Sequence, residues 1–389
     1  MPVLNRVAEN HSEIAEWRRD FHAHPELLYD VHRTAAEVAS RLRDFGVDEV
    51  ATGIGRTGVV GVIRGRQTES SKVIGLRADM DALPIVERTG APYASTVPGK
   101  MHACGHDGHT AMLLGAARHL AETRNFNGTV VVIFQPAEEG GGGGLAMIED
   151  GLLDRFGISE VYGMHNLPGL PVGRFAIREG SIMAATDEFR IEIEGQGGHA
   201  AMPHLATDPV VVAAHIITGL QTLVSRNVDP IRSAVLSITT MEAGSAHNVI
   251  PTMAKLTGTV RTLDEAVRDQ MQQGIETLAP QLARAFGAEA RITYRRGYPV
   301  TVNAPRQTGF ALEVARDVAG LDMVEADVDP TMGGEDFAYM LNARPGAYLF
   351  IGNGASSDLH SDTYDFNDDA IPYGVSYWVR LAEMALPLR

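Results

Sequence analysis

The chain has 389 residues, 44% of them hydrophobic and 21% charged, which is the composition of a globular protein and excludes disordered and collagen-like classes. This length exceeds one ordinary hydrophobic core and predicts two domains. The formal net charge of −16 argues against nucleic acid or an anionic membrane as the main partner. The single cysteine, Cys104, excludes an internal disulfide. A polar start and the lack of an apolar run near about 20 residues complete the prediction of a soluble, cytoplasmic protein.

The first part of the chain predicts strands that alternate with helices. Helical spacing over residues 33–45 ends at Gly46, a residue type that commonly caps a helix C-terminus. The continuous apolar run 130–134 is typical of a strand buried on both faces. Further strands are predicted at 58–63, 72–77 and 160–164, and a further helix at 110–123. This alternation predicts an α/β layer with a mostly parallel sheet flanked by helices.

The pattern changes after residue 182. Polar and apolar residues alternate over 188–194, which is typical of a sheet with one solvated face. The order of elements is then β-α-β-β-α-β and predicts a ferredoxin-like α+β domain inserted over residues 183–295. Its remaining elements are helices at 208–226 and 263–286 and strands at 234–240, 253–261 and 290–294. The first pattern resumes with a helix at 310–318, a strand at 348–352 and a final helix from Asp369, so residues 1–182 and 296–389 are predicted to form the other domain.

A run of metal-binding side chains lies at residues 102–109, where three imidazoles, one thiol and one carboxylate fall within eight positions. These groups are the usual ligands of zinc and related ions. Cys104 and His106, two residues apart, can point to one side of an extended segment. The alternative is a polar loop that is merely rich in histidine.

A pair of carboxylates, Glu138 and Glu139, directly follows the apolar strand 128–134. Ligand sites of open α/β sheets lie at such strand ends. One carboxylate can bind a metal while the other serves as general base; the alternative is a solvated acidic turn. The glycine run 140–144 offers backbone freedom for a close approach to the site and lacks the Lys-Ser/Thr ending of a phosphate-binding loop.

Two further histidines, His165 and His360, each follow a predicted strand of the same layer. A lone histidine is more often structural than a ligand, so neither residue carries the argument by itself. All four places follow strands of one sheet, however, so one edge of that sheet could gather them.

Several motifs occur in a fixed order along the chain. They are Arg77-Ala-Asp79-Met-Asp81-Ala-Leu-Pro84, His102-Ala-Cys104-Gly-His106-Asp107, Pro136-Ala-Glu138-Glu139-Gly140, Met164-His165, Gly198-His199-Ala-Ala-Met-Pro203-His204, Met332-Gly-Gly334-Glu335-Asp336-Phe337 and His360-Ser361. This order resembles the metal-dependent amidohydrolases that include hippurate hydrolase, N-acyl-L-amino-acid amidohydrolase and the auxin-conjugate hydrolases, relatives of aminoacylases and carboxypeptidases. The resemblance covers essentially the whole chain.

The resemblance implies a catalytic α/β domain interrupted by a smaller lid or dimerisation domain, and hence a homodimer or homotetramer. It implies Glu138 as catalytic base and His199 as the group that steadies the oxyanion, in a neighbouring subunit's site. Asn248, Arg261 and Gly334 are candidates for contact with an N-acyl amino acid substrate, although Arg261 could instead form a surface ion pair. The implied ligands of two divalent ions are Cys104, His106, Glu139, His165 and His360.

The chain departs from more distant relatives in one motif. Where those relatives carry a His-x-Asp that binds metal, this sequence has Asp79-Met-Asp81. Asp81 is therefore interpreted as orienting other groups rather than as a ligand. Cys104 as a ligand favours zinc over magnesium, with manganese, cobalt or nickel as alternatives.

Three other interpretations remain open at this point. A dipeptidase, a carboxypeptidase or an N-acetyl-diaminopimelate deacetylase could use the same scaffold. A non-catalytic binding protein could retain the fold, but the intact ligand set argues against it, because clustered ionised groups without a metal are costly to bury. A thiol enzyme could use Cys104 as nucleophile.

Overall fold

The computed structural model describes residues 4–389, which form two compact units. Unit 1 comprises the chain up to Gly180 together with Val302–Asp329 and Asp336–Arg389, and unit 2 comprises Ser181–Thr301 and Pro330–Glu335. The sequence-based division placed residues 181–182 and 296–301, as well as the short segment Pro330–Glu335, with the first part of the chain. This segment belongs to unit 2 because the amide of Ala184 donates a hydrogen bond to the carbonyl of Gly333 (2.9 Å).

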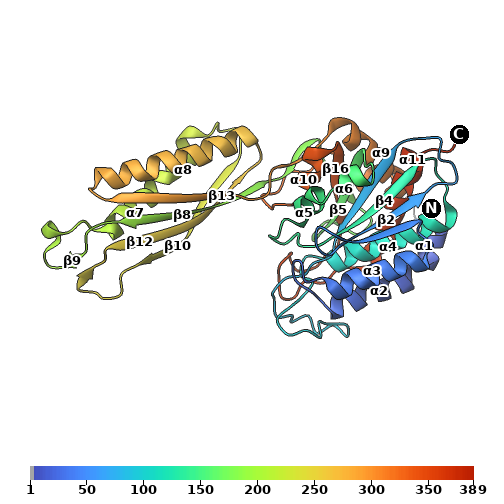
Figure 1. The fold of residues 1–389 in the computed structure, drawn as a ribbon, viewed down its shortest axis with the longest axis horizontal. Coiled ribbons are helices and arrows are strands. Elements are labelled where there is room, and N and C mark those ends of the chain that lie inside the picture. Colours follow the sequence, from blue (N-terminus) through green and yellow to red (C-terminus); the bar gives the residue numbers. More distant parts are fainter. Residues whose placement is uncertain (1–3) are drawn as a thin grey trace. The chain divides into compact units, whose positions relative to one another are not determined.

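An eight-stranded sheet forms the centre of unit 1, with the strand order β1-β2-β4-β3-β5-β16-β6-β15 (Figure 1). Its middle strands β4, β3, β5 and β16 run parallel to one another, as the sequence predicts. The residues of the apolar run 130–134 in β4 are completely buried, because helices cover both faces of the sheet. The strands are β1 (Glu49–Ile54), β2 (Gly58–Arg64), β3 (Val73–Asp79), β4 (Thr129–Gln135), β5 (Glu160–Leu167), β6 (Phe175–Ala176), β15 (Val324–Glu325) and β16 (Gly346–Gly352).

Two glycines of β2 show that opposite faces of the sheet carry different helices. A Cβ at Gly58 would meet Met147 of α5, whereas a Cβ at Gly61 would meet Leu42 of α3. Side chains an odd number of positions apart in a strand point to opposite faces. The helices of unit 1 are α1 (Asn5–Glu9), α2 (His11–Ala23), α3 (His32–Asp44), α4 (His106–Thr123), α5 (Gly143–Glu149), α6 (Leu152–Arg155), α9 (Pro305–Ala319), η3 (Leu321–Met323), α10 (Ala338–Ala343), η4 (Asp368–Ala370) and α11 (Ile371–Ala385).

Helix α4 is the central helix of unit 1 and packs against β3, α2 and α11. The sequence predicted its start at residue 110, but the helix begins at His106. Gly105 permits this early start, because its φ of +84° is a left-handed conformation that turns the chain sharply into the helix. Cys104 and His106 therefore flank a turn, and the expectation that they share an extended segment is wrong.

Three N-terminal elements were not predicted, namely the short helix α1, helix α2 and strand β1. Helix α2 buries Ile14, Trp17 and Phe21, which recur at helical spacing among many charged residues. Strand β1 lies at the edge of the sheet and is mostly exposed, so its sequence lacks the apolar alternation of a half-buried strand.

Unit 2 contains a four-stranded antiparallel sheet in the order β10-β12-β8-β13. Helices α7 and α8 pack on it, and their apolar side chains form a second hydrophobic core with those of the strands. This is the order of a ferredoxin-like domain, as the sequence predicts. The elements are β8 (Ala185–Glu194), η1 (Pro203–Leu205), α7 (Pro209–Thr222), η2 (Leu223–Asn227), β10 (Ala234–Ala243), β12 (Met253–Thr262), α8 (Glu265–Ala285) and β13 (Glu289–Arg296), with the ribbon β9 (Gly198–His199) and β11 (Val249–Ile250), and with β7 (Gly180–Met183) and β14 (Thr301–Asn303) at the boundaries between the units.

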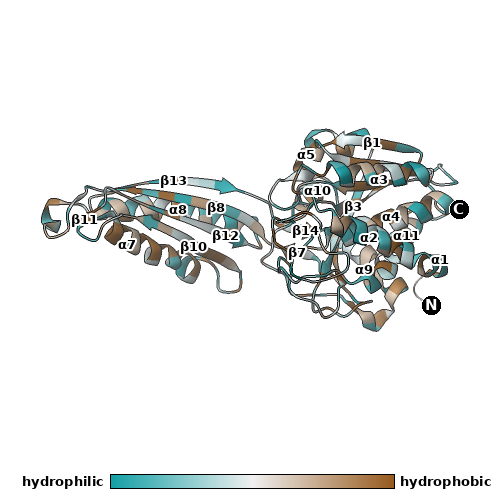
Figure 2. Ribbon diagram, turned by 90° about the horizontal axis from the view of Figure 1, so that it is seen from below, coloured by the Kyte–Doolittle hydropathy of each residue, from teal (hydrophilic) through white to brown (hydrophobic). Residues whose placement is uncertain are grey.

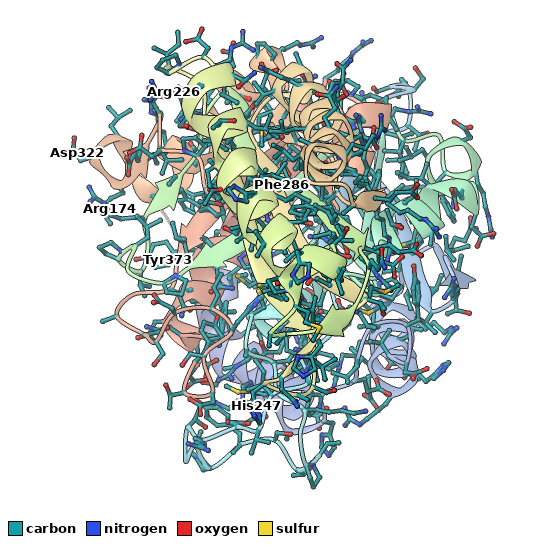
Figure 3. All side chains as sticks on the ribbon, turned by 90° about the vertical axis from the view of Figure 1, so that its left-hand side faces the viewer. Arg174, Arg226, His247, Phe286, Asp322 and Tyr373 are labelled. Atoms are coloured by element: carbon teal, nitrogen blue, oxygen red, sulfur yellow. The ribbon has the colours of Figure 1, made fainter. Side chains whose placement is uncertain are left out.

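Helix α7 and its continuation η2 are unusually apolar (Figure 2). By length and composition alone, Pro209–Asn227 could cross a membrane, which differs from the prediction that the chain holds no apolar run near that length. Val212, Ile216 and Leu220 pack into the core of unit 2, which accounts for much of this apolar character. One such helix is weak evidence for a membrane span, because core helices have the same composition. Phe286, which follows the end of α8, is labelled in Figure 3. Its ring stacks on that of His215 in α7, with 4.4 Å between the centroids.

Candidate metal centre

The parallel strands of unit 1 deliver the candidate ligands to one edge of the sheet. β3 ends at Asp79, β4 at Gln135 and β5 at Leu167, and parallel strands present these ends on the same side. Glu138 and Glu139 follow β4, His165 lies near the end of β5, and His360 lies in the loop after β16. The amide of His360 donates to the carbonyl of Ala103 (2.8 Å), which brings this late loop to the Cys104 segment.

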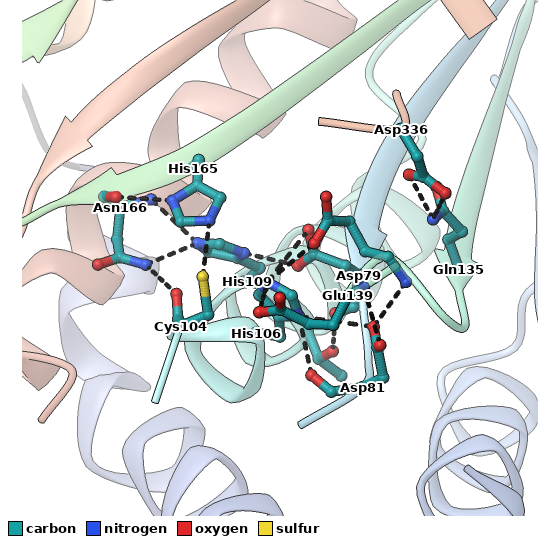
Figure 4. Close-up of polar contacts among 12 residues, drawn as sticks. Asp79, Asp81, Cys104, His106, His109, Gln135, Glu139, His165, Asn166 and Asp336 are labelled. Atoms are coloured by element: carbon teal, nitrogen blue, oxygen red, sulfur yellow. Dashed lines mark hydrogen bonds and ion pairs between the residues drawn. The ribbon is translucent and has the colours of Figure 1, made fainter. Parts of the chain in front are cut away.

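The five predicted ligands and Glu138 lie together in the structure. Figure 4 shows four of them, Cys104, His106, Glu139 and His165. Within each of three groups of side chains, the ligand atoms are within 4.8 Å of one another. Cys104 belongs to two of these groups, one with His106 and His165 and one with Glu139 and His360. The third group consists of His106, Glu138 and Glu139. Two overlapping sets that share one thiol are compatible with two ions held side by side.

Two imidazoles are oriented by backbone carbonyls. His106 Nδ1 donates to the carbonyl of Asp81 (2.8 Å), and His165 Nδ1 donates to that of Asn166 (2.7 Å). In the neutral form of each ring, Nε2 is therefore the lone-pair nitrogen, and this neutral form is the one that binds metal. His165 Nε2 lies 3.4 Å from the Cys104 sulfur.

The Asp81 carboxylate holds the backbone of Glu138 and Glu139 by hydrogen bonds. Its Oδ1 accepts the amide of Glu138 (2.9 Å) and its Oδ2 accepts the amide of Glu139 (3.1 Å). The turn continues into the glycine run, where a Cβ at Gly143 would lie 1.7 Å from the carbonyl oxygen of Pro136. The close approach that the sequence predicted for these glycines is therefore a contact with the turn itself.

Unsatisfied polar atoms test whether this cluster fits a cation. Among the described residues, His106 Nε2 and Glu139 Oε1 are buried and form no hydrogen bond. Glu139 Oε1 lies 3.4 Å from Nε2 of His360, another proposed ligand. Buried polar atoms normally form hydrogen bonds, so two that form none beside a thiol and a carboxylate pair fit a metal ion.

The electrostatics of the cluster point the same way. Burial opposes a charge on His106, but Asp79, Asp81 and Glu139 outweigh it and raise its pKa to about 10. Burial, together with the charges of Glu139 and Glu138, raises the pKa of the Cys104 thiol well above its ordinary value. This concentration of negative charge favours a cation. A buried thiol with a raised pKa is not the exposed, easily ionised group that a cysteine nucleophile requires, which disfavours the thiol-enzyme interpretation.

The structure adds a hydrogen-bonded network that the sequence analysis did not assign. His109 Nδ1 donates to Asp79 (2.6 Å), Arg77 donates to the other Asp79 oxygen (2.7 Å), and the same guanidinium donates to Asp336 (3.1 Å). His109 Nε2 accepts the backbone amide of Asn166 (3.0 Å). Asp79 and His109 lie within ligand distance of His106, but both ring nitrogens of His109 are occupied, so this histidine supports the cluster rather than joining it.

The first histidine of the 102–109 run lies apart from the ligand groups. His102 is buried, and neither ring nitrogen has a hydrogen-bond partner among the described residues. Burial lowers its pKa to about 3, so the ring is neutral. His22, Asp107 and Arg18 form a buried ionic group nearby.

The four remaining candidates lie in unit 2 and fall into two places. His199 pairs with Val249 in the β9–β11 ribbon, and the carbonyl of its neighbour Asn248 accepts the amide of Ala200 (3.1 Å). Arg261 in β12 pairs with Thr186 in β8. Gly334 lies against the same threonine, because a Cβ at position 334 would be only 2.1 Å from the Thr186 methyl carbon. Arg261 forms no ion pair with any described carboxylate, so the surface ion pair is not observed.

The fold and this cluster define a metal-dependent hydrolase of the amidohydrolase and peptidase type. A family model described as Peptidase family M20/M25/M40 matches residues 75–384. The chain belongs to this family.

Individual relatives agree with this assignment. The chain is 43% identical to a hippurate hydrolase of Campylobacter jejuni, over 98% of this chain and 99% of the relative. It is also 43% identical to an N-acetyl-L-cysteine deacetylase of Bacillus subtilis, over 91% of this chain and 83% of the relative. The crystal structure of the Bacillus subtilis YXEP protein, a dinuclear metal-binding peptidase of family M20, is 36% identical and gives a TM-score of 0.85, covering 97% of this chain and 99% of that one.

Proposed function

We propose that this enzyme hydrolyses the amide bond of N-acyl amino acids, giving a carboxylic acid and a free amino acid. The observation that carries the proposal is the position of Glu138 in one group with His106 and Glu139, beside the set that shares Cys104. A carboxylate next to a dinuclear site can act as a general base on water. The names of the two relatives, hippurate hydrolase and N-acetyl-L-cysteine deacetylase, support an N-acylated amino acid as substrate.

Two divalent ions are proposed as cofactors, and the two groups that share Cys104 would hold them. When bound, they polarise the substrate carbonyl and lower the pKa of water toward about 7. Zinc is the proposed metal because thiolate and imidazole together suit it, and manganese, cobalt or nickel are the alternatives. The proposed ligands are Cys104, His106, Glu139, His165 and His360.

The residues of the chain supply the proton transfers and the orientation. Glu138 takes a proton from the attacking water and delivers it to the leaving amine. Asp81 fixes the position of Glu138 through the backbone. His199 donates a hydrogen bond to the developing oxyanion, which is worth about 100- to 1000-fold in rate for contacts of this kind.

The amino-acid carboxylate of the substrate is proposed to bind Arg261. This side chain is half-buried, burial lowers its pKa, and no described carboxylate pairs with it. By contrast, the guanidinium of Arg268 already forms an ion pair with Asp187 (2.6 Å) and is not available to a ligand. Arg261 Nη1 donates to the Thr259 hydroxyl and to the carbonyl of Val260 (3.1 Å). A partly desolvated guanidinium without a carboxylate partner is suited to a carboxylate ligand. Asn248 and Gly334 remain proposed contacts.

The inserted domain, residues 183–295, is proposed to form a homodimer or homotetramer, so that His199 serves a neighbouring subunit. His199 is exposed on its ribbon, which leaves its ring available to another chain. Light scattering on the purified protein tests the oligomeric state. A cytoplasmic location also stays a prediction, based on the lone unpaired cysteine.

Elemental analysis combined with product assays tests the function. Purified enzyme should contain close to two ions per chain, and chelation should abolish hydrolysis of benzoyl- and acetyl-amino acids until zinc, manganese or cobalt is restored. A panel of dipeptides and N-acetyl-diaminopimelate addresses the alternatives on the same scaffold. Faster turnover of a dipeptide than of every N-acyl amino acid would overturn the proposed substrate class.

A further inference from the structure

We propose that Asn166 is the positioning residue of the metal centre, holding the Cys104 segment, strand β5 and helix α4 in the arrangement that the ions require. The inference rests on the proposed ligand set and concerns a residue that binds no ion itself. Asn166 directly follows the proposed ligand His165 and is completely buried.

Every polar atom of the Asn166 side chain is engaged. Nδ2 donates to the carbonyl of Cys104 (2.7 Å) and lies 3.1 Å from His109 Nε2. Oδ1 accepts the hydroxyl of Tyr364 (2.7 Å). Because the Cys104 carbonyl can only accept, the nitrogen of the amide must face it, which fixes the orientation of the whole side chain.

The backbone of Asn166 is engaged as well. Its amide donates to His109 Nε2 (3.0 Å), and its carbonyl accepts His165 Nδ1 (2.7 Å). One residue thus fixes the orientation of the His165 ring, the position of the Cys104 loop and the position of the His109 ring. The other nitrogen of His109, Nδ1, donates to Asp79. The Cys104 loop runs directly into helix α4, but strand β5 lies far along the chain, so the contacts of Asn166 help to set the distance between His165 and these two segments.

The shape of the Cys104 loop supports the same role independently. A Cβ at Gly105 would lie 2.3 Å from Asn166 Nδ2 and 2.5 Å from the Tyr364 hydroxyl. The loop therefore packs directly against the Asn166 amide, and Gly105, the residue in the left-handed conformation, is the residue in contact. A side chain at position 105 would displace Asn166 and Tyr364 together.

The chemistry of the contact explains why an amide is needed. Aspartate has the same shape but offers no donor to the Cys104 carbonyl or to His109 Nε2. Leucine fills the space but leaves the Cys104 carbonyl and the Tyr364 hydroxyl unpaired in a buried place. Neither change touches a proposed ligand, so any loss of metal affinity comes from altered positions.

Asn303 provides a matched control in the same unit. It is equally buried, donates to the carbonyls of Arg178 (2.9 Å) and Tyr348 (2.8 Å), and accepts the amide of Tyr348 (2.6 Å). Asn303→Asp removes the same number of side-chain donors from a place without proposed ligands. Its effect measures the general cost of losing a buried amide.

The experiment compares zinc affinity in the wild type, Asn166→Asp and Asn303→Asp, using competition with a chromophoric chelator, alongside thermal unfolding of the metal-free proteins. Asn166→Asp is expected to lower zinc affinity about 10- to 100-fold, the range found when groups that orient ligands are removed. Asn303→Asp should unfold at a similarly lowered temperature and bind zinc as the wild type does. Unchanged affinity in Asn166→Asp, or an equal loss in both variants, would overturn the inference.

A milder variant covers the case in which Asn166→Asp does not fold. Tyr364→Phe removes only the donor to Asn166 Oδ1, and a several-fold weaker zinc affinity is expected. Wild-type affinity in Tyr364→Phe would then overturn the inference. Failure of the wild type itself to bind zinc, manganese or cobalt would instead overturn the proposed metal centre, so the two failures are distinguishable.

Discussion

The Asp81 carboxylate anchors the backbone of Glu138, with its Oδ1 2.9 Å from the Glu138 amide nitrogen. The second oxygen does the same for the neighbouring Glu139. One buried side chain therefore sets the position of both the proposed base and a proposed ligand.

Asp81→Asn tests this anchoring. One carboxylate oxygen is replaced by an NH₂ group that must face a backbone N–H, so the turn carrying Glu138 shifts. We expect kcat to fall about 10- to 100-fold in steady-state assays of hippurate hydrolysis. Asp150→Asn, which alters a carboxylate accepting the amide of Gly55, should leave kcat unchanged. Equal kcat values for Asp81→Asn and the wild type would show that the anchoring is dispensable.

Glu138→Gln and Glu139→Gln should separate the base from the ligand. Glu138→Gln cannot accept a proton, so kcat should fall by about 10²- to 10⁴-fold while zinc content stays near that of the wild type. Glu139→Gln removes a charged ligand and should lose zinc as well. Elemental analysis and turnover are measured on the same preparations. A Glu138→Gln enzyme with near-normal turnover and normal zinc would contradict the assignment.

His22 should make stability depend on pH. Burial opposes its charge, but hydrogen bonds to Asp107 (2.9 Å) and Glu87 (3.3 Å) outweigh burial and raise its pKa from 6.5 to about 9. A raised folded-state pKa gives stability that is fully present below pH 6.5 and is lost as the pH rises through about 9. His22→Gln should therefore lower the free energy of unfolding at about pH 6 by up to ~3 kcal/mol.

Urea unfolding of the metal-free protein at about pH 6 and about pH 9.5 measures this effect. The difference between the wild type and His22→Gln should shrink markedly at the higher pH. His32→Gln, at a largely exposed site, serves as the control and should show little difference at either pH. A difference for His22→Gln that is constant with pH would show that the ring acts only through packing.

Arg261→Ala tests recognition of the substrate carboxylate. Loss of a charge-assisted contact of about 1.5–3 kcal/mol should raise KM for N-acyl amino acids about 10- to 100-fold. The matching substrates with a carboxamide in place of the carboxylate should be hydrolysed equally by both proteins. Arg190→Ala, an exposed position on the neighbouring strand β8, is the control. A rise in KM that is the same for both kinds of substrate would exclude a carboxylate contact.

The ligand set could be proposed from the sequence because thiol, imidazole and carboxylate side chains at strand ends are rare together, and the motif order matched a known family. Asn166 and His109 could not be assigned roles, although both lie in or next to those motifs. Their partners, such as Tyr364 and Asp79, come from distant parts of the chain, and hydrogen bonds of this kind leave no periodic signal.

The early start of helix α4 escaped prediction for a different reason. Its first turn consists of polar and glycine residues, from His106 to His109, which hydrophobic periodicity ignores. The positive φ of Gly105 sets the start of the helix, and the presence of a glycine in the sequence does not by itself predict a helix start. The succession of strands and helices in both domains, by contrast, could be predicted, because hydrophobic residues recur at a different spacing in strands than in amphipathic helices.

The ligands are drawn from segments that are synthesised at very different times, since Cys104 precedes the loop carrying His360 by most of the chain. The second set, which needs His360, can form only after strand β16 has docked beside β5. Contacts of such long sequence separation form late and slowly. A chain that ends before β16 can therefore offer Cys104, His106, Glu139 and His165 but not His360, and full loading with metal reports that unit 1 has finished folding.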